Sequence, residues 1–138
     1  MALKVDLIRD SLERVVQREP NLTRPFYARL FSRYPAVVPL FGARSAERQE
    51  QMLQEAIVAV VDHLEDATWL RQTLCGLGRQ HVDYGVTAPM YAWVQECLIE
   101  TLAEIAGDDW SEQHTAAWDE ALAAVSSLML AGAEARDA

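Results

Sequence analysis

The stretch LGRQHVDYGV, residues 77–86, contains the one histidine of this sequence that ends an apolar helical run. Leu77 and Gly78 precede His81 by four and three residues, and Leu74 lies one turn further back. A helix therefore places all four on one face. Because glycine lacks a Cβ, we expect something bulky to approach the backbone beside this imidazole. From the pattern alone, His81 is either a core histidine bonded to a carbonyl or a metal ligand.

Apolar residues recur with helical spacing along almost the whole chain, and no alternating strand pattern exceeds four residues. Seven or eight helices of unequal length predict an all-α fold in a single domain, residues 1–138, rather than a bundle of four equal helices. Four predicted helices cover residues 3–18, 45–65, 67–81 and about 111–133. A fifth is capped by Asn21 or Thr23 and is broken at Tyr34-Pro35, and a short turn over 37–41 follows it. A sixth is capped by Thr87 and runs to Gly107.

Composition excludes several classes of protein. The formal net charge is −9, which argues against nucleic-acid binding because phosphates require a basic surface. We find no signal peptide and no run of transmembrane length, so we expect a cytoplasmic protein without a membrane span. Cys75 and Cys97 have neither CxxC nor CxxCH spacing. This excludes a zinc ribbon and a thioether-linked haem, and two buried free thiols are expected instead.

Most catalytic motifs are missing from the sequence. There is no HExxH, no glycine-rich phosphate loop and no GxSxG elbow. His63, near a helix end, and His114, in a first turn, are predicted to be solvated. A single imidazole in an apolar pocket suits iron that is already held by four ring nitrogens. Haem needs only a fifth ligand from the protein, which leaves the sixth position for a small gas.

Four segments in this order resemble bacterial globins, and most closely the haem domain of flavohaemoglobins and their single-domain relatives. They are FYARLFSRYPAVVPLF (26–41), the helix beginning near Gln49, LGRQHVDYGV (77–86) and AAWDEAL (116–122). The resemblance covers nearly the whole chain. It implies a globin fold of seven to eight helices around a b-type haem (iron protoporphyrin IX), with His81 as the proximal iron ligand.

The resemblance also implies roles on the distal side of the haem. Tyr27 and Gln49 match the distal tyrosine and glutamine of this subgroup. Phe41 matches the phenylalanine that packs against the haem edge, and Leu53 matches the apolar wall of the distal pocket. A phenol O–H and an amide N–H can both donate to bound oxygen in a dry pocket, which would slow its dissociation.

The proximal side matches less completely. In flavohaemoglobins the ligand histidine belongs to a network with a tyrosine and a glutamate, which makes the imidazole more basic. His81 and Tyr91 match the first two members. The glutamate position falls on Ala133, and the nearest carboxylate, Glu134, is one residue further along. One residue rotates a helical side chain by about 100°, so the network is predicted to be incomplete.

Four functions are compatible with these residues. Reversible oxygen binding for storage or delivery, with nitric oxide and carbon monoxide as other ligands, is the expected one. The second is nitric-oxide dioxygenation; 138 residues leave no room for flavin and nicotinamide domains, so we expect a separate reductase to supply its electrons. The third is a haem-based gas sensor, which would normally need an output domain. The fourth is an all-α interaction module without a cofactor.

Overall fold

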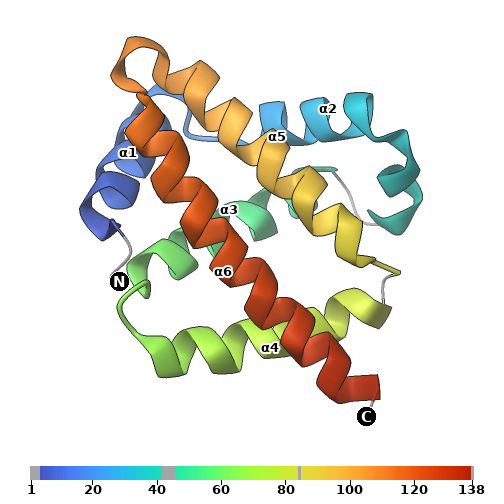
Figure 1. The fold of residues 1–138 in the computed structure, drawn as a ribbon. Coiled ribbons are helices and arrows are strands. Elements are labelled where there is room, and N and C mark those ends of the chain that lie inside the picture. The colour runs from blue at the N-terminus through green and yellow to red at the C-terminus, as the bar shows by residue number, and fades with distance from the viewer. Residues whose placement is uncertain (1–3, 42–45, 84, 138) are drawn as a thin grey trace.

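Helices make up nearly all of the computed structural model, which describes residues 4–41, 46–83 and 85–137, without the side chains of residue 83 and residues 134–137. No strand occurs in these ranges, so the predicted all-α fold is confirmed. The elements are α1 (Val5–Arg18), α2 (Thr23–Arg33), the 3₁₀ helix η1 (Pro35–Phe41), α3 (Ala46–Asp62), α4 (Ala67–Asp83), α5 (Ala88–Ala106), the 3₁₀ helix η2 (Gly107–Asp109) and α6 (Glu112–Asp137) (Figure 1).

Local chemistry explains where α2 and α5 end. Tyr34 ends α2 because the following Pro35 disfavours a helical conformation in the residue before it. Gly107 ends α5 with a φ of 57°, which glycine adopts without strain. Thr87 precedes α5, as predicted, whereas α3 is shorter than the predicted 45–65.

The main core lies where α1, α2, α5 and α6 pack together. Phe26 and Leu30 of α2 and Leu102 of α5 are each at most 1% exposed. Trp118 of α6 is also buried, and its indole N–H donates to the Ser11 hydroxyl of α1 over 2.9 Å. Complete burial of such side chains contributes about 1.5–3 kcal/mol each. The core between these four helices is therefore the stable frame on which the other elements pack.

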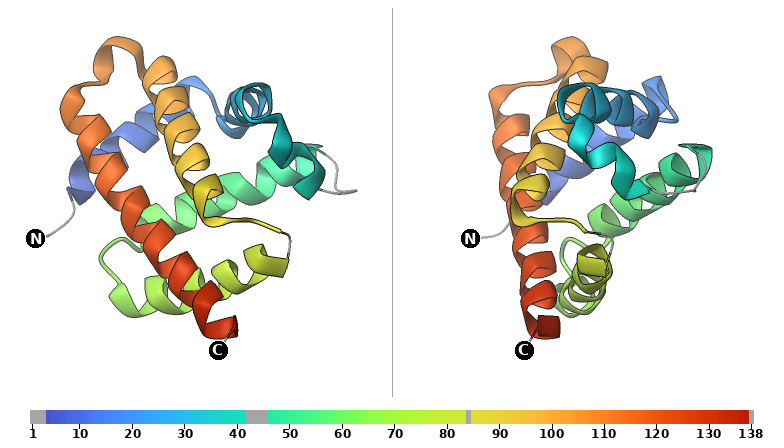
Figure 2. Two further views of the ribbon diagram at one scale, coloured as in Figure 1. Left: turned by 45° about the vertical axis from the view of Figure 1, so that its right-hand side comes forward. Right: turned by 90° about the vertical axis from the view of Figure 1, so that its right-hand side faces the viewer.

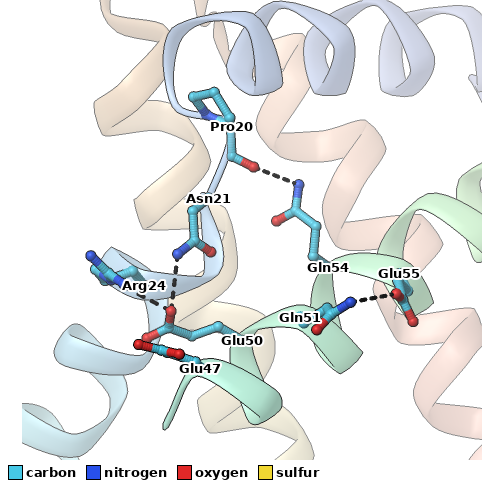
Figure 3. Close-up of a pocket in the computed structure, with 8 residues that line it drawn as sticks. All are labelled: Pro20, Asn21, Arg24, Glu47, Glu50, Gln51, Gln54 and Glu55. Atoms are coloured by element: carbon cyan, nitrogen blue, oxygen red, sulfur yellow. Dashed lines mark hydrogen bonds and ion pairs between the residues drawn. The ribbon is translucent and has the colours of Figure 1, made fainter.

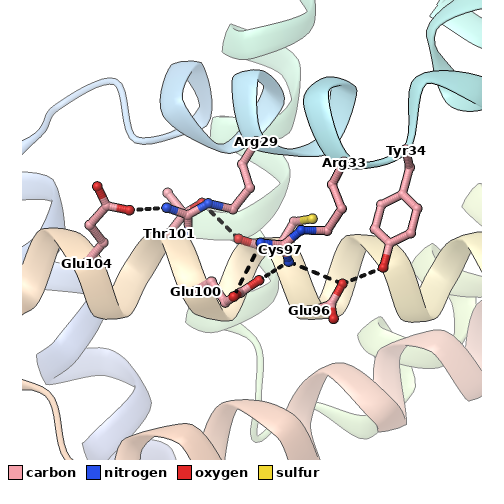
Figure 4. Close-up of polar contacts among 8 residues, drawn as sticks. All are labelled: Arg29, Arg33, Tyr34, Glu96, Cys97, Glu100, Thr101 and Glu104. Atoms are coloured by element: carbon pink, nitrogen blue, oxygen red, sulfur yellow. Dashed lines mark hydrogen bonds and ion pairs between the residues drawn. The ribbon is translucent and has the colours of Figure 1, made fainter.

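Charged side chains follow the outer edge of the α2–α5 contact (Figure 4). Arg29 and Arg33 of α2 pair with glutamates spaced along α5. The Tyr34 hydroxyl donates to Glu96 over 2.6 Å. Exposed pairs of this kind contribute little free energy, but a row of them sets the register of two helices. The ion pairs are Arg29–Glu104, Arg33–Glu100 and Arg33–Glu96.

Both cysteines are free thiols, although only one is fully buried. Cys97 lies under the row of charges and is 0% exposed, and burial raises the pKa of its thiol. Cys75 is half-buried, and its Sγ lies 3.4 Å from the carbonyl oxygen of Leu128. The expectation of two buried thiols is therefore correct for Cys97 and only partly so for Cys75.

Helices α4 and α6 cross at two glycines. A side chain at Gly78 would overlap the backbone of Met129, and one at Gly132 would overlap the backbone of Cys75. We expected Gly78 to admit something bulky beside His81. That expectation is confirmed, and the bulky neighbour is the main chain of α6 at Met129. Glycine at both positions lets the two helix axes approach closely.

Helices α3 and α4 pack on different neighbours. Helix α3 lies against α1 and α2, and α4 lies mainly against α6. The two helices run back from a short corner, so the first turns of α3 and the last turn of α4 lie on the same side of the molecule (Figure 2). Glu50 and Val61 are the only buried residues of α3. Its apolar residues Leu53 and Ile57 are only half-buried.

The corner between α3 and α4 differs from prediction. His63 is half-buried rather than solvated, and its ring stacks on Trp69 with centroids 3.9 Å apart.

His114, near the start of α6, is also half-buried rather than solvated, and its Nδ1 accepts from the Ser111 N–H over 3.1 Å. Within the described ranges, no helix is both long enough and apolar enough to cross a membrane.

Candidate functional site

His81 lies in the last full turn of α4 with its imidazole held in one orientation. Its Nδ1 lies 2.6 Å from the carbonyl oxygen of Leu77, one turn earlier. Because a carbonyl can only accept, Nδ1 carries the proton, and in a neutral ring the lone pair is then on Nε2. This is how proteins fix the tautomer of a metal-ligating histidine. The ring is half-buried.

Tyr91 of α5 is the aromatic neighbour of His81. The two ring centroids are 6.3 Å apart and their planes are tilted by 33°. Burial raises the pKa of the Tyr91 phenol. Ala133, where the resemblance would place a glutamate, is half-buried in α6, and the side chain of Glu134 lies outside the described residues. Two of the three predicted proximal residues are thus in the same neighbourhood.

Tyr27 of α2 belongs to a cluster of aromatic rings. Its ring centroid is 5.5 Å from that of Phe31 and 5.4 Å from that of Phe41, and Phe41 meets it edge-on. Edge-to-face packing at these distances is favourable and restricts rotation of each ring. Burial, and secondarily the charge of Glu50, raise the pKa of the Tyr27 phenol to about 12. The hydroxyl is therefore a proton donor throughout the neutral range.

Gln49 and Leu53 lie one turn apart near the start of α3. Both are half-buried, and Leu53 packs against the same core as Tyr27 and Phe41. The structure thus brings Tyr27, Phe41 and Leu53 into one apolar region, and Gln49 is on the same helix as Leu53. His81 and Tyr91 form the second group, on α4 and α5.

These groups fit a flat, apolar cofactor better than a bare metal ion. In the described residues, no three His, Cys, Asp or Glu side chains form a group that could hold a metal. Haem brings four of its own ligands and requires only one imidazole. The half-buried apolar side chains of α3 and α4, such as Ile57 and Leu77, would gain about 25 cal/mol per Å² that such a ring covers.

Sequence reasoning missed one buried polar residue, Glu50, beside Gln49. Asn21 Nδ2 donates to Glu50 Oε1 over 2.9 Å (Figure 3). The Thr23 hydroxyl donates to the Glu50 backbone oxygen over 2.9 Å. We predicted that Asn21 or Thr23 would cap α2. Neither does, because α2 has Leu22 at its N-cap position and no side-chain cap. No local pattern marks Glu50, since its partners lie 29 and 27 residues away.

A polar pocket of about 430 Å³ opens between the start of α2 and the first half of α3 (Figure 3). None of the six predicted site residues lines it. Gln54 Nε2 donates to the Pro20 carbonyl over 3.1 Å, while Gln54 Oε1 is buried without a hydrogen-bond partner. The pocket is therefore distinct from the candidate cofactor site. Its lining residues are Pro20, Asn21, Arg24, Glu47, Glu50, Gln51, Gln54 and Glu55.

The chain is similar to known proteins over most of its length. A family model for globins matches residues 24–129. The chain is 31% identical to a flavohemoprotein of Bordetella pertussis over 111 residues, which are 79% of this chain but 28% of that protein. It is 28% identical to an uncharacterized globin-like protein of Aquifex aeolicus, covering 85% of this chain and 82% of that one. The chain thus spans less than a third of the flavohemoproteins that it matches.

One solved structure is similar over the full length. It is an engineered carbene transferase, RmaNOD, described as a putative nitric oxide dioxygenase from Rhodothermus marinus. The two superpose with a TM-score of 0.84 at 26% identity, covering 97% of this chain and 94% of that one.

Proposed function

This chain belongs to the globin family, and we propose that it would hold a b-type haem through His81 and bind oxygen reversibly. The observation that carries the proposal is the contact of His81 Nδ1 with the Leu77 carbonyl. This contact leaves the Nε2 lone pair as the ligating atom of a neutral imidazole. Haem supplies, when bound, an iron centre with one further position for a small gas.

The chain's own residues would exclude water from the gas-binding position and donate hydrogen bonds to the bound oxygen. Phe41 and Leu53 supply apolar surface that excludes water. Tyr27, which is half-buried, supplies a hydroxyl whose pKa of about 12 keeps it protonated. Gln49 supplies an amide N–H from the facing helix. Two donors that hold a partly negative ligand in a water-poor pocket slow its release.

The first experiment is the visible absorption spectrum of the purified protein, recorded as isolated, after reduction and after exposure to oxygen. A strong haem band that shifts reversibly with oxygen is the expected result. A protein that is colourless and takes up no added haem would contradict the proposal.

Nitric-oxide dioxygenation is the second candidate function. Its support is the similarity to RmaNOD over 97% of this chain, together with the raised pKa that keeps the Tyr27 hydroxyl protonated. The reaction joins nitric oxide and oxygen to form nitrate and consumes one electron, which a separate reductase would supply. Rapid mixing of the oxygenated protein with nitric oxide, followed by repeated turnover with and without a reductase, separates the two functions. If nitric oxide consumes the bound oxygen rapidly once, but added reductase does not sustain nitrate formation, oxygen binding is the favoured function.

A further inference from the structure

The first half of α3 is anchored to α2 by a buried carboxylate instead of buried apolar side chains. Glu50 is 8% exposed, and the other buried residue of α3, Val61, lies near the opposite end. Arg24 Nε lies 3.4 Å from the same Oε1 that accepts from Asn21. A charge is retained in such a place only when it is paired and hydrogen-bonded, so the three groups form one unit.

A second contact ties the main chain of α3 to the same point. The Thr23 hydroxyl, on a residue that is 0% exposed, donates to the Glu50 backbone oxygen. Thr23 lies one turn before Tyr27 on α2, and Glu50 directly follows Gln49 on α3. The junction therefore joins the two helical turns that carry the proposed donors. Burial is the main cause of the raised pKa of Tyr27 and the charge of Glu50 is a secondary one, which is consistent with a carboxylate close to the phenol.

We propose that Glu50 is a positioning residue of the distal side: by tying α3 to the start of α2, it sets where the Gln49 amide lies relative to the Tyr27 hydroxyl. This inference rests on the proposed function, since it takes Gln49 and Tyr27 to be the donors to a haem ligand. Glu50 itself touches no ligand. Its effect on ligand release passes through Gln49.

The test is a double-mutant cycle on the haem-loaded protein, with the oxygen dissociation rate as the readout. Glu50→Gln keeps the shape of the side chain but loses the charge that pairs with Arg24. We expect Glu50→Gln and Gln49→Ala each to raise the rate roughly fivefold. The double variant should dissociate oxygen no faster than Gln49→Ala alone, because Glu50 acts through Gln49. Effects that multiply would overturn the inference.

The control is Glu47→Gln, which removes an exposed carboxylate one turn earlier from the wall of the same pocket. Its rate should stay within about twofold of the wild-type rate, since exposed charges contribute little. The C–O stretching frequency of the carbon monoxide complex gives a readout that general destabilisation would not move. It should shift in Glu50→Gln toward the value of Gln49→Ala, and an unchanged frequency would overturn the inference.

Amide hydrogen exchange separates failure of this inference from failure of the proposed function. If the chain takes up no haem, the proposed function fails, but exchange over residues 46–55 still tests the anchor. Faster exchange in Glu50→Gln than in Glu47→Gln supports the anchor, and equal exchange overturns it. If haem binds and Gln49→Ala leaves oxygen release unchanged, the positioning role is overturned while haem binding stands.

Discussion

Gly78 on α4 lies directly against the main chain of Met129 on α6, because glycine has no side chain to separate the two helices at this point. A methyl group at Gly78 would lie within 2.8 Å of the Met129 Cα and closer still to its carbonyl group. Backbone atoms cannot move aside as a flexible side chain can. We therefore expect Gly78→Ala to lower the free energy of unfolding by about 1–3 kcal/mol, measured by urea denaturation.

Gly76→Ala is the matched control for this prediction. It is on the same helix, and the nearest atom to an added methyl group is the end of the Arg79 side chain at 3.9 Å. Alanine favours helix more than glycine does, so Gly76→Ala should stabilise the protein by about 0.5–1 kcal/mol. Equal effects of the two substitutions would mean that α4 and α6 do not approach as closely as the structure indicates.

His81→Ala should abolish haem binding or weaken it greatly, because no other imidazole lies in the candidate site. Haem titration followed at the main absorption band measures this change. His63→Ala is the control, since His63 stacks on Trp69 at the corner between α3 and α4. It should keep the band. A normal five-coordinate histidine spectrum in His81→Ala would show that the ligand is assigned wrongly.

Tyr27→Phe should speed oxygen release, because it removes one hydrogen-bond donor and leaves the aromatic packing in place. The loss of one hydrogen bond is worth roughly 1–2 kcal/mol, which corresponds to a rate about five to thirty times faster. Stopped-flow displacement of oxygen measures the rate. Phe31→Leu is a suitable control, since it disturbs the ring next to Tyr27 without removing a donor. A rate unchanged in Tyr27→Phe would mean that the hydroxyl faces elsewhere.

The raised pKa of Tyr27 predicts a loss of stability in alkali. The phenol ionises at its ordinary pKa of 10.0 in the unfolded chain and at about 12 in the folded one. Between these values the unfolded state has released its proton and the folded state has not, so unfolding becomes more favourable as pH rises. We expect Tyr27 to account for about 2 kcal/mol of this loss.

Urea denaturation at pH 9 and pH 11.5 measures the effect, with Tyr27→Phe as the comparison. All other ionisable side chains are the same in both proteins, so the difference between the two declines isolates the contribution of Tyr27. The variant should lose less stability than the wild type between the two pH values. A parallel decline in both proteins would show that Tyr27 is not buried in the folded state.

The helices could be predicted because each needs only a local apolar repeat and its end signals. His81 follows from the repeat that ends α4, and Tyr34-Pro35 and Gly107 mark real helix ends. The side chains assigned by resemblance lie in two groups, and their roles toward haem remain predictions. Residue spacing placed them on helices, whereas the resemblance supplied their chemistry.

The predictions that failed depended on contacts between residues that are distant in the sequence. Asn21 and Thr23 have side chains suited to capping a helix. The prediction that one of them caps α2 was wrong because both side chains donate hydrogen bonds to Glu50 instead. The face of α4 that carries Gly78 was predicted correctly, but a repeat does not reveal which helix will cover it. His63 was taken as solvated because Trp69 reaches it only across the corner.

The mainly one-sided packing of α4 has a consequence for the lifetime of the loaded protein. Helix α4 rests chiefly on α6, at a crossing where Gly78 and Gly132 let the two main chains meet, so α4 can separate from the rest of the molecule only if this crossing opens. The proposed iron ligand is thus on a helix whose position depends mainly on one crossing. Loss of the cofactor and opening of that crossing should be one event, so substitutions at the α4–α6 crossing should change the rate of haem loss before they change oxygen affinity.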